Sequence, residues 1–301
     1  MGFSNQPLTN EAARKLMALD VQDKEILTYE KLDEWYTAWG GQCYVSFSGG
    51  KDSTVLAYLA ARYLASFRTP PWELNLVEVS NCVWLARKNG NGTRMARLRG
   101  ELLDRDGNPS AYNCENWAFL LDAPFLVSSE CCKVMKKSTA HRYESTAKRK
   151  PIIATMAVEG RQRFQKWTAT GCNAFEGNRP MGKPMSFWTE QDVLRFIVER
   201  GLPYASVYGD IVASDGENDY GATLIDCKLH CTGCQRTGCM FCGFGAHLEK
   251  GENRFERMRR THPKHYQFCI GGGAFDTDGL WKPTKDGLGY ARLLDYIGVR
   301  Y

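Results

Sequence analysis

The chain has 301 residues and a formal net charge of +5, with 43% hydrophobic and 24% charged residues. These proportions are close to the globular average, so they exclude a chain that is disordered throughout. No run approaches the roughly 20 apolar residues of a membrane helix, and the N-terminal MGFSNQPLTNE has neither the basic start nor the apolar core of a signal peptide. We therefore expect a cytoplasmic protein with no membrane partner, whose mild positive charge suits an anionic substrate.

Predicted strands and helices alternate along the first two thirds of the chain. Helical patterns at 9–20 and 22–39 precede a β-prone run at 42–47, and a glycine turn at 48–53 leads into a helix. The further strand candidates are 74–79, 124–129 and 151–155. This alternation predicts an α/β fold with a doubly wound, mostly parallel sheet, covered by helices on both faces, whose ligands bind at the carboxyl ends of the strands.

A capped helix and a polar linker follow. Thr189 and Asp192 have the spacing of a capping box, VLRFIVER is amphipathic, and Gly201 ends the helix. Residues 209–222 are polar and glycine-bearing, and the composition beyond them changes to cysteines, glycines and basic residues, so we place a boundary near residue 215. The expected segments are N-terminal helices at 1–40, a strand-and-helix domain at 41–214 and a cysteine-rich region at 215–301.

The glycine loop Ser48-Gly49-Gly50-Lys51-Asp52-Ser53 is the strongest signal in the first half of the chain. Two glycines let backbone amides approach an anion, and the helix start behind the loop adds the positive end of its dipole. Lys51 supplies a point charge for phosphates, Asp52 can hold Mg²⁺, and the serines can donate hydrogen bonds to phosphate oxygens. A Walker A loop would need a glycine where this chain has Val45. The pattern predicts a phosphate-binding loop of another kind.

The segment SGGKDS resembles the PP-loop of the ATP pyrophosphatase superfamily, which includes GMP synthetase, tRNA thiolation enzymes and the PAPS reductases. The resemblance implies a fold like that of the adenine nucleotide alpha hydrolases, with ATP and Mg²⁺ bound at residues 48–53. It also implies catalytic roles for Lys51 and Asp52 and cleavage of ATP between its α and β phosphates. On this basis residues 41–214 are expected to form a nucleotide-binding domain.

Other segments are similar to one branch, the PAPS reductase-like family. ECC at 130–132 with KVMKK behind it, PIIATMAVEGRQR and KPMSFWTEQDV resemble three segments of that family, so the resemblance covers roughly residues 40–245. It implies substrate contacts from Glu159, Arg161 and Arg163. The chain departs from the family at SNCVWLARKNGNGTR, where the family has a TG-acidic segment, and at Glu159-Gly160, where it often has Glu-Ser.

The cysteines predict a metal centre. Five of the 12 lie between Cys227 and Cys242, and four of these form the pattern Cys231-x2-Cys234-x4-Cys239-x2-Cys242. Disulfides are rare in a reducing compartment, so clustered cysteines there indicate metal or redox chemistry. A zinc ribbon separates its two pairs by more residues, so the short spacing favours a 4Fe–4S cluster, with zinc as the alternative.

The ligand set has alternatives. Around RTGCMFC the chain is similar to sulfur-transfer proteins of DNA phosphorothioation, which favours Cys239 and Cys242 together with an upstream cysteine, Cys231 or Cys234. An arrangement like that of APS reductase would combine Cys239 and Cys242 with the CC pair, Cys131 and Cys132. Further alternatives are Cys227 and Cys269. Cys239 and Cys242 belong to nearly every version.

Two basic stretches stand outside these motifs. Their residues are Arg87, Lys88, Arg94, Arg97 and Arg99 in the first, and Lys133, Lys136, Lys137, Arg142, Lys148, Arg149 and Lys150 in the second. Each is either a solvated helix face or a funnel for a polyanion, such as a nucleotide or a nucleic-acid backbone. Tyr112, Trp117 and Tyr143 could stack on bases, but core packing is the simpler prediction for each.

Three functions are compatible with these motifs. The first is an ATP-using sulfur-transfer enzyme, for which we expect a nucleotide substrate, a nucleic acid among the candidate acceptors, a sulfur-donating cysteine desulfurase as partner, and a homodimer as one assembly. The second is a PAPS or APS reductase, which needs a nucleophilic cysteine on its tail, whereas LLDYIGVRY has none. The third is a non-enzymatic nucleotide-binding module, against which the intact Lys51 and Asp52 argue.

Overall fold

The computed structural model describes residues 3–68, 76–78, 96–97, 99–123, 125, 137–213, 227–235, 237–243, 245–277, 279 and 281–301. Contacts divide the chain into two units, which are described separately. The first comprises Met1–Val83 and Cys132–Thr237, and the second comprises Trp84–Cys131 and Gly238–Tyr301. This division places residues 227–237 with the first unit, whereas the sequence suggested a boundary near 215; the three-segment assignment itself stays a prediction.

The first unit is built on a mostly parallel sheet in the strand order β2-β1-β3-β5-β4. Its strands are β1 (Cys43–Phe47), β2 (Leu76–Glu78), β3 (Lys150–Ile152), β4 (Asn173–Ala174) and β5 (Met181–Gly182). Strand β1 pairs in parallel with β2 and β3, β3 pairs in parallel with β5, and β4 runs antiparallel at the edge. The expected mixed α/β class with a mostly parallel sheet is thereby confirmed.

The expected strands agree with this sheet where the structure describes them. The runs at 42–47 and 74–79 contain β1 and β2, whereas the candidate at 124–129 lies, apart from Phe125, outside the described residues. Strand β3 ends at Ile152, so residues 153–155 leave the sheet instead of extending it. Strands β4 and β5 have two residues each, too few to give an alternating pattern in the sequence.

Helices of the first unit provide most of its core. They are α1 (Asn10–Met17), α2 (Val21–Ala38), α3 (Lys51–Phe67), α5 (Ser138–Ala147), α6 (Arg161–Thr170) and α7 (Glu190–Arg200). The side chains of Thr9 and Asp20 accept hydrogen bonds from backbone amides at the starts of α1 and α2, which fixes where the two expected helices begin. Val55, Leu56 and Leu59 of α3 are fully buried, as their helical spacing predicts.

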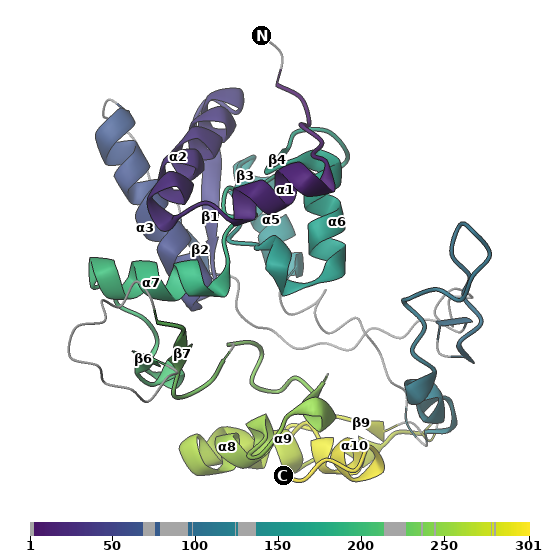
Figure 1. The fold of residues 1–301 in the computed structure, drawn as a ribbon. Helices are drawn as coiled ribbons and strands as arrows, with labels where there is room; N and C mark the ends of the chain where they lie inside the picture. Colours follow the sequence, from purple (N-terminus) through teal and green to yellow (C-terminus); the bar gives the residue numbers. More distant parts are fainter. Residues whose placement is uncertain are drawn as a thin grey trace. The chain divides into compact units, whose positions relative to one another are not determined.

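Both faces of strand β1 are covered. Cys43 Sγ lies 3.9 Å from the carbonyl oxygen of Trp35 on α2, whereas the Tyr44 hydroxyl donates to Glu144 of α5 at 2.6 Å. Neighbouring side chains of a strand point to opposite faces, so α2 and α5 contact opposite faces of the sheet. Figure 1 shows α2 and α3 to one side of β1 and α5 to the other.

Helix α7 begins and ends as its sequence predicts. The Thr189 hydroxyl accepts from the Asp192 amide, while Asp192 Oδ2 accepts from the Thr189 amide at 2.6 Å. Gly201 ends the helix in the left-handed region at φ 59°. Asp192 Oδ2 also lies 2.7 Å from Lys24 Nζ of α2, and both side chains are buried. The capping residue therefore also ties α7 to α2.

A short hairpin follows α7. Strands β6 (Ile211–Ala213) and β7 (Leu229–Cys231) pair antiparallel, and a 3-10 turn, η4 (Ser206–Tyr208), precedes them. The predicted linker at 209–222 is therefore wrong for residues 211–213, which form a strand; residues 214–222 lie outside the described ranges. The backbone groups of Ile211, Val212 and Ala213 pair with those of β7, so this short apolar run inside an otherwise polar segment forms a strand.

The second unit has its own small core. Its elements are the 3-10 helices η1 (Glu115–Asp122) and η5 (Ala246–Leu248), helices α8 (Arg254–Thr261), α9 (Pro263–Ile270) and α10 (Tyr290–Tyr296), and strands β8 (Ala274–Phe275) and β9 (Trp281–Lys282). Phe255, Cys269 and Leu294 are fully buried in this core. Among the described helices of both units, none is long and apolar enough to cross a membrane.

Breaking the buried Lys24–Asp192 pair should destabilise the first unit. Lys24→Met leaves a buried carboxylate without its cation, which typically costs about 3–5 kcal/mol. Urea unfolding followed by circular dichroism measures the change. The matched control is Lys15→Met, because Lys15 pairs with Glu11 while both side chains are 77% exposed, and it should leave the midpoint unchanged. Equal midpoints for Lys24→Met and the wild type would contradict the prediction.

Candidate functional site

A cavity of about 540 Å³ opens at the carboxyl ends of β1 and β3 in the first unit. Its size is in the range of cavities that hold a small organic ligand. Its lining comes from β1 and the glycine loop, the segment after β3 and the start of α6, the start of α7, η4, and Thr237. The lining residues are Ser46, Ser48, Gly50, Lys51, Asp52, Ser53, Ile153, Ala154, Thr155, Met156, Val158, Glu159, Arg163, Thr189, Glu190, Gln191, Tyr208 and Thr237.

The glycine loop has the predicted strand–loop–helix form. Gly49 lies in the left-handed region at φ 71°, a conformation that glycine adopts without strain. The Ser53 hydroxyl accepts from the Ser48 amide at 3.2 Å and donates to the carbonyl of Gly50 at 2.9 Å. This single side chain closes the loop on the first turn of α3. Lys51 and Asp52 are the first two residues of that helix, and both line the cavity.

Lys51 is the most constrained side chain of the site. It is only 5% exposed, and its ammonium lies 3.0 Å from the Glu190 carboxylate and donates to the Gln235 carbonyl at 3.0 Å. Its backbone amide donates to the Tyr208 hydroxyl at 3.2 Å. Burial lowers the pKa of Lys51, but the hydrogen bond to Glu190 and the charge of Asp52 together hold it above its ordinary value. Lys51 is therefore a cation.

The three predicted substrate residues divide between the cavity and the surface. Glu159 and Arg163 line the cavity and form an ion pair with each other, and Glu159 also accepts from the Met156 amide at 3.1 Å. Arg161 begins α6 with an exposed side chain and is not among the lining residues. The structure thus brings two of the three to the glycine loop.

The charges that line the cavity show no cationic excess. Lys51 and Arg163 face three carboxylates, those of Asp52, Glu159 and Glu190. A bare polyphosphate would meet more negative than positive charge on entering. A divalent cation bound with it would reverse that balance, because carboxylate and phosphate oxygens are the ligands that Mg²⁺ prefers.

Four residues that meet the glycine loop were missed by sequence reasoning: Glu190, Tyr208, Gln235 and Thr237. Glu190 follows the capping residue of a well-marked helix, so its place at a helix start was predictable although its pairing was not. Nothing in the sequence around Tyr208 or Thr237 indicates that their hydroxyls meet, at 2.9 Å, beside Gly50. These contacts arise from residues far apart in the sequence.

Cys231 and Cys234 belong to the first unit, on a segment that we call the closing segment (residues 231–235 and 237). The amides of Gly233 and Cys234 donate to the carbonyls of Tyr208 and Val207 at 2.8 and 2.9 Å. A Cβ on Gly233 would lie 2.4 Å from the Val207 oxygen, so this close approach requires glycine. Burial raises the pKa of the Cys231 thiol, and the charge of nearby Lys51 opposes that rise.

Cys239 and Cys242 belong to the second unit, where a tight turn joins them. The Cys242 amide donates to the Cys239 carbonyl at 2.9 Å, and the Arg254 guanidinium donates to the Cys242 carbonyl at 3.0 Å. Cys269 of α9 is fully buried. Burial raises the pKa of the Cys269 thiol to about 12, and the charge of Cys239 adds to the rise, so these two thiols are neighbours.

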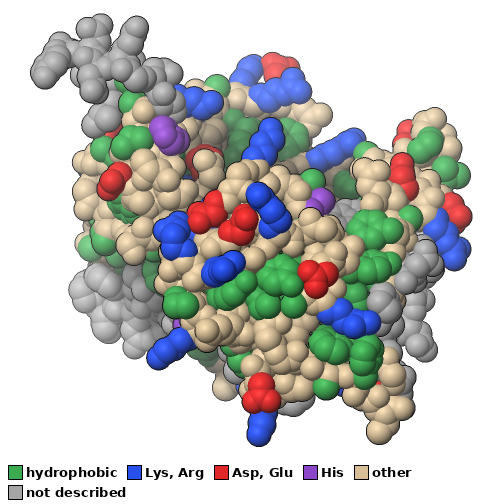
Figure 2. Space-filling view, turned by 90° about the horizontal axis from the view of Figure 1, so that it is seen from below, with side chains coloured by type: hydrophobic (Ala, Val, Ile, Leu, Met, Phe, Trp, Pro, Cys, Tyr) green, Lys and Arg blue, Asp and Glu red, His purple; other side chains and the backbone are tan. Residues whose placement is uncertain are grey.

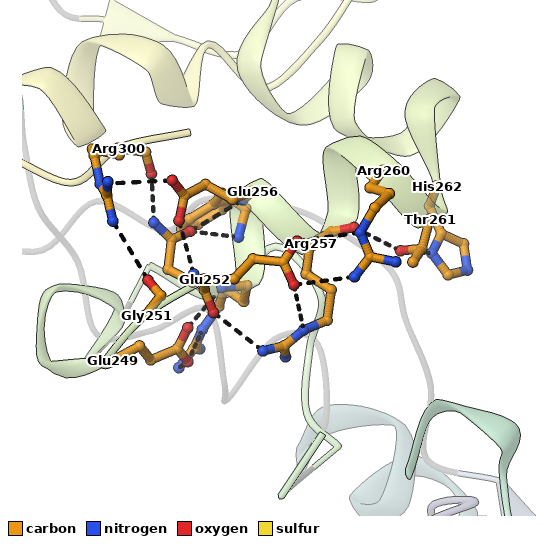
Figure 3. A network of polar contacts seen from close by, with 12 residues as sticks. Glu249, Gly251, Glu252, Glu256, Arg257, Arg260, Thr261, His262 and Arg300 are labelled. Carbon is orange, nitrogen blue, oxygen red and sulfur yellow. Dashed lines mark hydrogen bonds and ion pairs between the residues drawn. The ribbon is translucent and has the colours of Figure 1, made fainter. Parts of the chain in front are cut away.

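A network of ion pairs surrounds the start of α8 in this unit (Figure 3). Arg257 and Arg260 both reach Glu252, at 3.6 and 3.1 Å, and Asn253 caps the helix and donates to the Arg300 carbonyl at 2.8 Å. Arg254 pairs with Glu249 while holding the Cys242 carbonyl. The network therefore anchors the turn that carries Cys239 and Cys242.

The predicted ligands do not form a metal-ready group in the described ranges. Within those ranges, no three His, Cys, Asp or Glu side chains are arranged to hold a metal ion. Each CxxC pair lies in a different unit, and Cys131 and Cys132 fall outside the described residues. Each pair nevertheless offers partly buried or buried sulfur, and a tight turn joins Cys239 to Cys242; thiol sulfur is the donor of a thiolate-bound centre.

The basic stretches are partly described. Arg97 donates to the Tyr112 carbonyl at 2.8 Å, with its guanidinium 6.0 Å from that ring, and Arg99 is exposed. The ring of Tyr143 packs edge-on against that of Tyr44, and Tyr143 is partly buried. On the face seen in Figure 2, basic and acidic side chains are interspersed. The structure does not describe Arg87, Lys88 and Arg94 of the first stretch. The same holds for Lys133 and Lys136 of the second stretch and for the side chain of Trp117.

Comparison with known proteins gives no family. A scan against protein-family models matched none to this chain, and a search of curated proteins found no relative.

Proposed function

We propose that this chain is a PP-loop ATP pyrophosphatase of the PAPS reductase-like family that adenylates an acceptor and transfers sulfur to it. The observation that carries the proposal is the folded glycine loop. It sits at the carboxyl end of a central parallel strand, with Lys51 beginning the next helix, beside a cavity of about 540 Å³. Ligands of parallel α/β sheets bind at such an edge. The proposal includes a doubly wound sheet of the adenine nucleotide alpha hydrolase type.

The proposed reaction uses the groups that line the cavity. An acceptor oxygen attacks the α-phosphorus of ATP, the bond to the β-phosphate oxygen breaks, and pyrophosphate leaves with the bond's electron pair. Lys51 and the amides of the loop stabilise that developing charge, as preorganised donors do in phosphoryl transfer. A sulfur nucleophile then displaces AMP from the adenylated acceptor. Asp52 and Glu190 are the carboxylates that would hold Mg²⁺, which neutralises charge on the phosphates.

The charge balance of the cavity favours this reading over a sulfonucleotide reductase. With three carboxylates against two cations, the site suits a nucleotide that arrives with Mg²⁺. A non-enzymatic nucleotide-binding module stays the third candidate.

For the cysteines we propose a 4Fe–4S cluster, with zinc as the alternative, held by Cys239 and Cys242 and completed by Cys231 and Cys234. A cluster of this kind supplies a thiophilic centre for the transferred sulfur. Because Cys269 neighbours Cys239 within the second unit, it is the strongest replacement for an upstream ligand. A cysteine desulfurase would supply the sulfur, and a nucleic acid is among the acceptors that we propose.

Removing the Lys51 ammonium should weaken ATP binding. Lys51→Ala loses a charge-assisted contact to phosphate, which is worth about 1.5–3 kcal/mol. Isothermal titration calorimetry with ATP and Mg²⁺ measures the loss. Lys228→Ala is the matched control, because Lys228 is exposed in the same unit and does not line the cavity. Equal ATP affinities for Lys51→Ala and wild type would place the site elsewhere.

The products should identify the bond that is cut. With a suitable acceptor, ATP should yield AMP and pyrophosphate, because the loop resembles the PP-loop and lacks Walker A spacing. Ion-exchange chromatography of the nucleotide products, with acceptor candidates tested one by one, makes the measurement. ADP and phosphate as the main products would contradict the assignment of residues 48–53 as a PP-loop.

The cysteines should bind iron. Protein purified without oxygen should be brown and contain iron and sulfide, and Cys239→Ser or Cys242→Ser should lose most of the iron, because a harder oxygen ligand replaces a soft thiolate. The alternative ligand sets are compared by iron content. Loss of iron in Cys269→Ser would indicate that Cys269 is a ligand, and loss of iron in the double change of Cys131 and Cys132 to Ser would indicate the set that includes this pair. Cys43→Ser is the matched control, since Cys43 is buried against α2 in the sheet. Stoichiometric zinc without sulfide would refute the cluster.

A further inference from the structure

Three oxygen atoms of the protein accept hydrogen bonds from, or pair with, the two N–H groups of Lys51 that would bind phosphate under the proposed function. The Lys51 amide donates to the Tyr208 hydroxyl, and the Lys51 ammonium meets the Gln235 carbonyl and the Glu190 carboxylate. A phosphate oxygen bound at the loop would need these same N–H groups, because the first amides of a helix and a lysine ammonium form the usual phosphate cradle. The three oxygens thus stand in for those of a phosphate.

Two hydroxyls lie directly beside the loop. The Tyr208 hydroxyl is 2.9 Å from the Thr237 hydroxyl, and a Cβ built on Gly50 would have them as its nearest atoms, at 3.3 and 3.1 Å. Tyr208 is only 2% exposed, so its ring is fixed by packing and cannot swing freely into solvent. The hydroxyl pair therefore stands where a phosphate would approach Gly50 and Lys51.

The closing segment is firmly attached on one side of this contact. Backbone hydrogen bonds hold Thr232, Gly233 and Cys234 to residues 207–210, and Gln191 of α7 bonds both backbone groups of Leu229 at 2.8 Å. Beyond Cys234, the Gln235 carbonyl contacts the Lys51 ammonium and the Thr237 hydroxyl contacts that of Tyr208. Release of these two contacts would free residues 235 and 237 while β7 stays in place.

We propose that Tyr208 is a positioning residue that holds the closing segment against the glycine loop, and that its hydroxyl contacts break when the diphosphate part of a nucleotide binds. Phosphate competes with the Tyr208 hydroxyl for the Lys51 amide and with the Gln235 carbonyl for the Lys51 ammonium, so binding at the loop releases Gln235 and, through Tyr208, Thr237. Gln235 follows Cys234, so occupation of the nucleotide site reaches the first CxxC pair through one residue. This inference rests on the proposed nucleotide site and adds a coupling to it.

Inorganic pyrophosphate with Mg²⁺ is the probe for this competition. Tyr208→Phe and Thr237→Val each remove one hydroxyl, and each should bind pyrophosphate roughly three- to tenfold more tightly in calorimetry, because one net hydrogen bond no longer opposes binding. Thr232→Val is the matched control: its hydroxyl accepts from the Asp210 amide on the same segment, away from Lys51, and its affinity should equal that of the wild type. Damage to the fold does not produce tighter binding.

Fluorine NMR gives a second readout. In protein labelled with 3-fluorotyrosine, the resonance that is absent from Tyr208→Phe belongs to Tyr208, and saturating pyrophosphate should shift it in the wild type. An unshifted Tyr208 signal at saturation, or equal or weaker affinity in both Tyr208→Phe and Thr237→Val, would overturn the competition while leaving the nucleotide site intact. Absence of binding to all four proteins would instead overturn the nucleotide site, and this inference with it.

Discussion

The burial of one ammonium group constrains the whole site. A lysine cation removed from water must find oxygen partners, because an uncompensated buried charge is strongly destabilising. Lys51 finds them on three separate parts of the first unit: Glu190 at the start of α7, Gln235 on the closing segment and, for its backbone amide, Tyr208 at the end of η4. The positions of α7, η4 and the closing segment around the glycine loop are thus tied to satisfying this one residue.

The parts of the fold that could be predicted are those with local signals. Each of these signals spans only a few residues. They are the capping box of Thr189 and Asp192, the glycine that ends α7, and the apolar spacing of α3. Strands β4 and β5 carried no such signal, because strands of two residues depend on their partners rather than on their own pattern. The expected linker failed at β6 because the apolar run Ile211-Val212-Ala213 lies inside a mostly polar segment, whose overall composition conceals it.

The same contrast holds within the site. Lys51 and Asp52 were predictable because a strand, a glycine loop and a helix coincide around them. Glu159 and Arg163 came from a resemblance, and the structure places both on the cavity wall, whereas Arg161 is exposed. Tyr208 and Thr237 could not be predicted, since only tertiary packing brings hydroxyls that lie far from Lys51 in the sequence against the first turn of α3.

Exchange of partners at Lys51 also explains why the cavity can carry a surplus of carboxylates. Without a ligand, Glu190 neutralises Lys51, and its side chain is 46% exposed, so water still solvates much of that carboxylate. A phosphate that takes over Lys51 leaves Glu190 and Asp52 facing new negative charge across a short distance, which is unfavourable unless a cation enters with the phosphate. A divalent ion resolves both problems at once, because it binds phosphate oxygens and carboxylates together. If the proposed function holds, the acidic lining would favour a nucleotide that arrives with its metal, and Lys51 would be the cation that is already in place.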